Sequence, residues 1–195
     1  QLSWVWARDI GDVERGESPE NAYDRARERA VWLDIPKHRV TGNLIYEFPF
    51  AKSARGVKGA LLKGWEWNSV YSFFSGEYLT PTWTVSDPTG TAFTNNRTPA
   101  QVTIRPNHLY DANIPTSERS TGRWFDLGAF AAPNPGFFGT SAKGVIKGPG
   151  SAVVNAGLAK NFVIAERARV RWEMTATNFF NTTNFGSASS LPGAL

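Results

Sequence analysis

Side chains that bind metal ions or act as nucleophiles are few in this sequence. It has no Cys and only two His residues, His38 and His108, and neither has a second His at the spacing of a metal site. The serine-nucleophile motif GxSxG does not occur, and the glycine-rich run GVIKGPG at 144–150 lacks the phosphate-binding pattern that ends in GKS or GKT. We therefore expect a protein that is not an enzyme and that uses no cofactor or metal ion.

Charged and amide side chains occur instead at alternate positions of three segments. Alternate residues of a β-strand point to the same face of a sheet, so these side chains would share one water-facing surface. This pattern makes them candidates for contact with a ligand or with a water-filled lumen. The residues are Arg39, Asn43, Glu66, Asn68, Arg169, Arg171 and Glu173.

Five segments have the two-residue period of a strand, and in each the apolar side chains take the phase opposite to the polar ones. The clearest is the last, where Val170, Trp172 and Met174 alternate with Arg171 and Glu173. The pattern predicts an all-β fold of antiparallel strands. The five segments are about 1–10, 39–50, 64–76, 151–164 and 167–181.

Long and short connections alternate between these strands. The segments 11–38 and 80–150 are long, whereas 51–64 and 165–167 are short turns. The 80–150 segment has no sustained period and is rich in Pro, Gly, Asn and Thr, which favours a functional loop outside a rigid scaffold.

The first long connection also has a helical signal. Ala22, Ala26 and Ala30 lie four residues apart and predict one short helix within 21–33. Its many charged residues are expected to lie in water, as are the paired carboxylates Glu17 and Glu20.

Strand length and loop asymmetry together indicate a membrane barrel. A tilted strand needs about 9–11 residues to cross a bilayer, and bacterial barrels have short periplasmic turns and long external loops. Most of the large aromatic side chains fall near the short turns, as in the aromatic girdle of a membrane interface. Two cations in the apolar phase, Arg8 and Lys160, lie near strand ends, where a long side chain can reach the interface.

Five strands are too few to close such a barrel. At about 4.8 Å per strand they span roughly 24 Å, whereas the smallest membrane barrels have eight strands. The chain is therefore expected to be a piece of a longer barrel. The alternative is a soluble, secreted β-sandwich that binds a ligand such as carbohydrate through exposed Trp residues.

Composition limits the other classes of function. The net charge is +4 over 195 residues, but both signs are scattered and no basic stripe follows one element, so we expect no nucleic-acid partner. No run approaches the roughly 18 apolar residues of a membrane-spanning helix.

Several motifs resemble the barrel strands of TonB-dependent outer-membrane receptors, and most closely the Oar-like branch with its carboxypeptidase-regulatory-like domain. They follow the order of that family and cover most of the chain. They are the Trp-rich opening strand with RDIGD, DIPKHRVTGNLIYEFPF, GWEWNSVYSFFSGEYLTP, DPTGTAF, RWFDLGAFAAPNPGFFG, and GPGSAVVNAGLAKNFVIAERARVRWEMTATNFFNTTNFG.

The resemblance implies part of a large barrel, of roughly twenty-two strands, that takes up a bulky ligand in the outer membrane of a Gram-negative-type bacterium. Its partners would be outer-membrane lipid, an unidentified transported ligand, and the TonB complex through a plug region that these residues do not include. The family's RWFD run is matched by Arg123, Trp124, Phe125 and Asp126. We expect these residues in an extracellular loop, where they would support the loop structure rather than contact the ligand.

Overall fold

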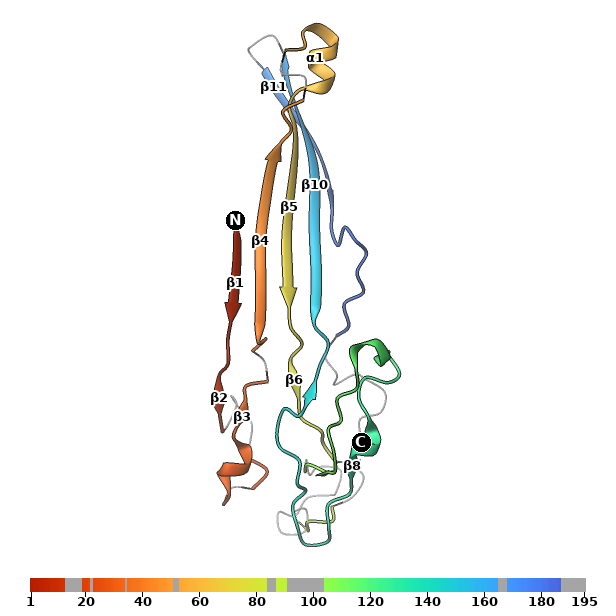
Figure 1. Cartoon of the computed structure of the whole chain (residues 1–195). Helices are drawn as coiled ribbons and strands as arrows, with labels where there is room; N and C mark the ends of the chain where they lie inside the picture. Colours follow the sequence, from red (N-terminus) through yellow and green to blue (C-terminus); the bar gives the residue numbers. More distant parts are fainter. Residues whose placement is uncertain are drawn as a thin grey trace. The chain divides into compact units, whose positions relative to one another are not determined.

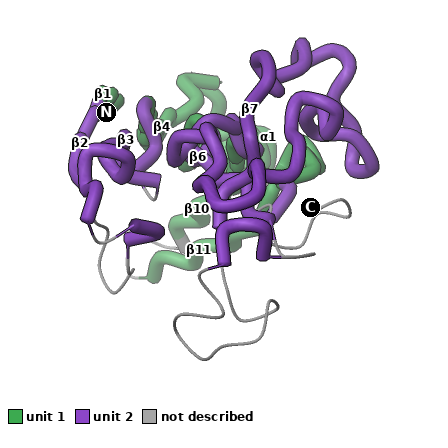
Figure 2. Tube along the Cα trace, turned by 90° about the horizontal axis from the view of Figure 1, so that it is seen from below, with its two compact units in different colours: residues 1–6, 38–75, 150–184 green, residues 7–37, 76–149, 185–195 purple. Residues whose placement is uncertain are grey.

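A computed structural model describes residues 1–12, 19–21, 23–33, 35–50, 53–83, 87–90, 104–164 and 168–186. The chain forms two compact units, coloured separately in Figure 2. Unit 1 comprises Gln1–Trp6, His38–Ser75 and Gly150–Asn184, and unit 2 comprises Ala7–Lys37, Gly76–Pro149 and Phe185–Leu195. None of the described residues belongs to a helix that is long and apolar enough to span a membrane.

Unit 1 is built on a five-stranded antiparallel sheet in the order β1-β4-β5-β10-β11, whose strands lie side by side in Figure 1. Each strand pairs with its neighbour in an up-and-down arrangement, as the alternation predicts. The strands are β1 (Leu2–Trp6), β4 (His38–Glu47), β5 (Trp65–Phe74), β10 (Ser151–Ile164) and β11 (Ala168–Ala176).

The register aligns the apolar phases of all five strands on one face. Leu2 pairs with Gly42, Leu44 with Ser69, and Leu158 with both Trp67 and Met174. We call this surface the apolar face. It is made of Leu2, Trp4, Trp6, Val40, Gly42, Leu44, Tyr46, Trp65, Trp67, Ser69, Tyr71, Phe73, Ala152, Val154, Ala156, Leu158, Lys160, Phe162, Val170, Trp172, Met174 and Ala176.

Large side chains on the apolar face are open to the surroundings. Leu44 is 46% exposed, Val170 49% and Met174 58%. The other side of the sheet, which we call the polar face, carries the charged phase, together with exposed apolar side chains such as Ile45 and Val70.

Four strands are shorter than the alternation predicts: β4 and β5 by a few residues, and β1 and β11 by about half of a strand or less. β1 ends at Trp6, and Ile10 pairs with Val31 in a separate two-stranded sheet. β11 ends at Ala176 because the chain turns at Asn178, whose φ of 49° is left-handed and whose backbone N–H donates to the Asn155 side chain. Phe180 therefore does not continue the apolar face.

The connection between β4 and β5 is more than a turn, because it contains a helix, α1 (Gly56–Leu62), at the end of the sheet. Aromatic rings gather near this end: Tyr46 lies edge-on to Phe48 at 5.2 Å, and Trp65 to Trp172 at 6.3 Å. This is the clustering that the sequence predicts beside the short connections.

Unit 2 consists of short elements joined by irregular chain. β2 (Ile10–Gly11) pairs with β3 (Ala30–Val31), β6 (Tyr78–Leu79) with β9 (Ile146–Lys147), and β7 (Asn107–His108) with β8 (Phe130–Ala131). The 3₁₀-helices among its described residues are η1 (Arg25–Glu28), η3 (Thr116–Glu118) and η4 (Leu127–Ala129).

This unit has a hydrophobic core of its own. Ala112, Ala129, Phe130 and Ile146 are buried together, with three partly buried neighbours, Leu79, Phe125 and Val145. The described part of the 80–150 segment is therefore a packed structure, which its irregular sequence does not predict.

A buried cluster of charges joins distant segments of unit 2. The Arg105 guanidinium contacts both carboxylate oxygens of Glu28 at 3.0 Å and lies 2.7 Å from Glu20. Arg27 also pairs with Glu20, at 3.2 Å, and Lys143 with Glu28, at 3.4 Å. The side chains of Glu20, Glu28 and Arg105 are at most 4% exposed.

The predicted helix within 21–33 is wrong for this reason. Among the described residues of this range only η1 is helical, and Arg29 is already extended, with φ −67° and ψ 113°. Burial of Glu28 at 1% exposure, against Arg105, replaces the solvated face that the charges predict. The Glu20 side chain is 4% exposed, so it is not solvated either, whereas Glu17 lies outside the described residues.

Removal of one charge from this cluster should loosen unit 2. Glu28→Gln removes one of the two carboxylates that pair with the buried Arg105 guanidinium, and the loss of this buried partner costs roughly 3 kcal/mol. Hydrogen exchange of the Ile104, Arg105 and Asn107 amides in the full-length protein in detergent should accelerate about 100-fold. Asp12→Asn is the control, because the Arg25–Asp12 pair is more than half exposed and contributes at most about 0.5 kcal/mol. Equal exchange in both variants would contradict a stabilising role for the cluster.

Candidate functional site: a polar network across three strands

Four of the seven predicted lumen candidates meet on the polar face. The Arg171 guanidinium on β11 contacts both carboxylate oxygens of Glu66 on β5, at 2.8 and 3.2 Å. Arg171 also lies 3.3 Å from Glu173, and the Asn68 amide donates to Glu173 at 3.1 Å. We call these four residues the polar network.

The network spans β10, which separates its two parent strands. This requires small residues on β10: Ala159 pairs with both Glu66 and Glu173, and Gly157 pairs with Asn68. Ala159 is fully buried, and a Cβ added at Gly157 would overlap the Asn68 side-chain amide. Gly157 and Ala159 therefore create the space in which the charged side chains cross the middle strand.

The chemistry of this arrangement is binding and hydration. Two carboxylates face one guanidinium, so the network has one negative charge in excess and presents oxygen acceptors to water or to a cationic group. Glu66 and Arg171 form a bidentate pair, which holds both side chains in fixed positions.

The three other candidates lie elsewhere on the polar face. Arg39 stacks over the Phe74 ring at 5.1 Å, and Arg169 is the cross-strand partner of Val163. Asn43 exchanges hydrogen bonds with Gln1 through its backbone. All seven candidates share one face of the sheet, and their exposure to a lumen stays a prediction.

The two His residues belong to different units. His38 begins β4 and stacks on Trp4 at 6.1 Å, and His108 in β7 stacks on Phe130 at 5.3 Å. Among the residues that the structure describes, no group of three His, Asp or Glu side chains is placed to hold a metal ion.

The predicted loop candidates make architectural contacts in unit 2. The Trp124 indole N–H donates to the Lys147 carbonyl at 2.8 Å, and Phe125 packs on Phe130 at 6.1 Å. Asp126 accepts from the Gly128 N–H at 3.0 Å and so caps η4. Arg123 closes a turn with Ser120 through its backbone.

Two acidic groups of this loop have shifted pKa values. The Tyr110 hydroxyl donates a hydrogen bond to Asp126 at 3.1 Å. Desolvation is the main cause that raises the pKa of Tyr110, and this hydrogen bond is the second. The backbone and side-chain N–H groups of Asn113 donate to Asp111 and lower its pKa. Both shifts come from local hydrogen bonds or desolvation that support the loop conformation.

The sequence argument did not identify the two small residues of β10, Gly157 and Ala159, as part of the site. Gly157 and Ala159 carry no chemistry, so an inspection of charged side chains passes over them. The available signal is their phase: they lie on the polar face, at positions where a strand facing water normally has longer polar side chains.

A family model described as "Outer membrane beta barrel domain" matches residues 1–194. The chain belongs to this outer membrane β-barrel family. Comparisons with curated proteins and with solved structures found no match.

This membership assigns the protein to the cell outer membrane and its antiparallel strands to a transmembrane barrel. The exposed side chains of the apolar face agree with contact to hydrocarbon. The soluble β-sandwich alternative is not supported, because Val170 and Met174 are not sealed between two sheets.

The packing of the network on β10 can be tested with one methyl group. Gly157→Ala should displace Asn68 and destabilise the barrel by roughly 1–2 kcal/mol. Adding Asn68→Ala should recover most of this loss, because the smaller side chain leaves room for the new methyl. Urea unfolding of the full-length protein in lipid vesicles, followed by Trp fluorescence, measures the difference.

Gly122→Ala is the matched control, since an added Cβ there meets nothing within 4 Å. Strict additivity of the Gly157 and Asn68 changes would show that the two residues do not share this space.

Proposed function

We propose that this chain forms part of the wall of a TonB-dependent transporter that takes up a bulky ligand with energy from the inner membrane. The observation that carries the proposal is the contrast between the faces of the sheet: exposed apolar side chains on one, and the polar network on the other. A wall of this kind separates hydrocarbon from a hydrated passage.

The ordered resemblance of the strand motifs to TonB-dependent receptors supports the energised form of transport. In this proposal the passage is closed by a plug that contacts TonB, and the polar face lines the route of the ligand. Unit 2 supports an external role as well, because its segments connect β1 to β4 and β5 to β10, and long connections of bacterial barrels lie outside the cell.

Unit 2 is suited to hold a ligand-contacting surface in place. Its core around Phe130 and its buried cluster around Arg105 fix the conformation of the long connections. Leu109, Tyr110 and Phe137 remain exposed on it. A rigid loop with exposed aromatic and aliphatic side chains loses little conformational entropy when it binds a ligand.

Energy dependence is the property that tests this proposal. Cells that produce the full-length protein should accumulate at least one fluorescent peptide or oligosaccharide from a graded size series. Accumulation should stop when a protonophore collapses the proton gradient, and also when the TonB gene is deleted. Cells that lack the full-length protein are the control.

Uptake that persists in the presence of the protonophore and falls smoothly with probe size would contradict the proposal. That result would describe a passive pore.

A further inference from the structure

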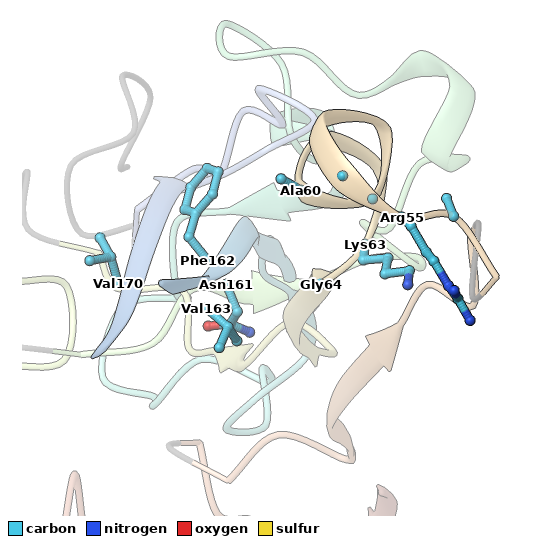
Figure 3. Close-up of a pocket in the computed structure, with 11 residues that line it drawn as sticks. Arg55, Ala60, Lys63, Gly64, Asn161, Phe162, Val163 and Val170 are labelled. Carbon is cyan, nitrogen blue, oxygen red and sulfur yellow. The ribbon is translucent and has the colours of Figure 1, made fainter. Parts of the chain in front are cut away.

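An open pocket of about 950 Å³ lies within unit 1, between α1 and the ends of β10 and β11. Figure 3 shows Arg55 and Lys63, from the segment around α1, on one side and Phe162, Val163 and Val170 on the other. The pocket thus combines an apolar wall with two cationic side chains. None of the four residues of the polar network lines this pocket.

The described segment around α1 is positively charged. Residues 53–64 contain Arg55, Lys58 and Lys63 and no acidic side chain. Of the acidic side chains at the adjoining strand ends, Glu47 lies on the polar face, and Glu66 is held by the bidentate pair with Arg171.

The position of the pocket along the strands indicates a bilayer interface. Trp65 and Phe162 flank the nearly buried Lys160, whose ammonium donates to the Lys63 carbonyl and lies 5.4 and 5.1 Å from the two rings. An aromatic belt with a cation that reaches out of the apolar face is typical of the headgroup level.

Helix α1 presents apolar side chains at the same level. Val57 is 77% exposed and Leu61 61%, while Lys58 stands on the same helix. A short helix of this composition is suited to lie at the headgroup boundary, with its apolar residues toward the acyl chains.

The chain topology selects the leaflet. The connection that contains α1 and the β10–β11 turn are the short ones, and short connections of bacterial barrels are periplasmic. The lipids available there are phospholipids. We infer that the pocket binds the phosphate headgroup of an anionic phospholipid from the periplasmic leaflet, with Arg55 and Lys63 on the phosphate and Phe162 and Val170 beside the acyl chains.

This inference depends on the barrel family and on the orientation of the strands, and it is independent of the proposed transport. A phospholipid held here would tie the helical connection to the bilayer and fix the depth of the strands. Energised uptake can fail its own test without affecting the lipid site.

Native mass spectrometry of the full-length protein, released from vesicles of phosphatidylethanolamine and phosphatidylglycerol, measures the site directly. The wild-type protein should retain phosphatidylglycerol in preference to phosphatidylethanolamine. Arg55→Gln and Lys63→Gln should each weaken retention roughly five-fold, as expected for the loss of about 1 kcal/mol per cation. Lys58→Gln is the matched control, because it removes the same charge from the same helix outside the pocket, and it should have little effect.

A second variant tests the apolar part of the pocket at constant charge. Ala60→Phe fills the space between α1 and β10 and should also reduce the retention of phosphatidylglycerol. Thermal unfolding of the same variant checks that the barrel remains folded. Equal losses in the Lys58 and Arg55 variants would overturn the inference, because they would show diffuse attraction to a basic surface. Retention of lipid A in place of phosphatidylglycerol, from vesicles that contain both, would overturn it too by placing the pocket in the other leaflet.

Discussion

The structure depends on the pairing of five strands in one register that keeps every apolar phase on the same side. In hydrocarbon each unpaired backbone group costs several kcal/mol, so strands can cross a membrane only when they are paired, and pairing fixes where every side chain points. A slip of one residue between β10 and β11 would move Val170 and Met174 to the polar face and Arg171 to the lipid. Burial of that guanidinium charge in hydrocarbon makes the slip costly.

Within this register, β10 has a particular role. Gly157 and Ala159 have no long side chains that would occupy the space above β10. Glu66 and Asn68 can therefore contact Arg171 and Glu173 across this strand. The network links strands that are not neighbours and adds a second set of contacts to the backbone ladder. At the other phase of the same strand, Lys160 is nearly buried between aromatic rings, which a cation tolerates because its ammonium donates to a carbonyl at the strand end.

The sequence predicted which segments form strands, their antiparallel succession and which side chains share a face. This was possible because two-residue alternation is a local signal and contact with a membrane makes it strong. The meeting of Arg171 with Glu66 was predictable only as membership of one face, because the contact depends on the small residues between them. Unit 2 could not be predicted in the same way. Glu28 lies in a run of charged residues typical of a solvated loop, and its burial depends on Arg105, 77 positions away along the chain. Pairing over that distance leaves no periodic trace.

The most direct test of the two-faced sheet uses the absence of Cys in the chain. Single Cys residues at Val170, Met174, Arg169 and Thr175 of the full-length protein can carry nitroxide labels in lipid vesicles, and electron paramagnetic resonance then measures collisions with oxygen and with a water-soluble nickel complex. Labels at 170 and 174 should collide mainly with oxygen, and labels at 169 and 175 mainly with nickel. Equal accessibility at all four positions, or the reverse alternation, would contradict a wall with hydrocarbon on one side and water on the other.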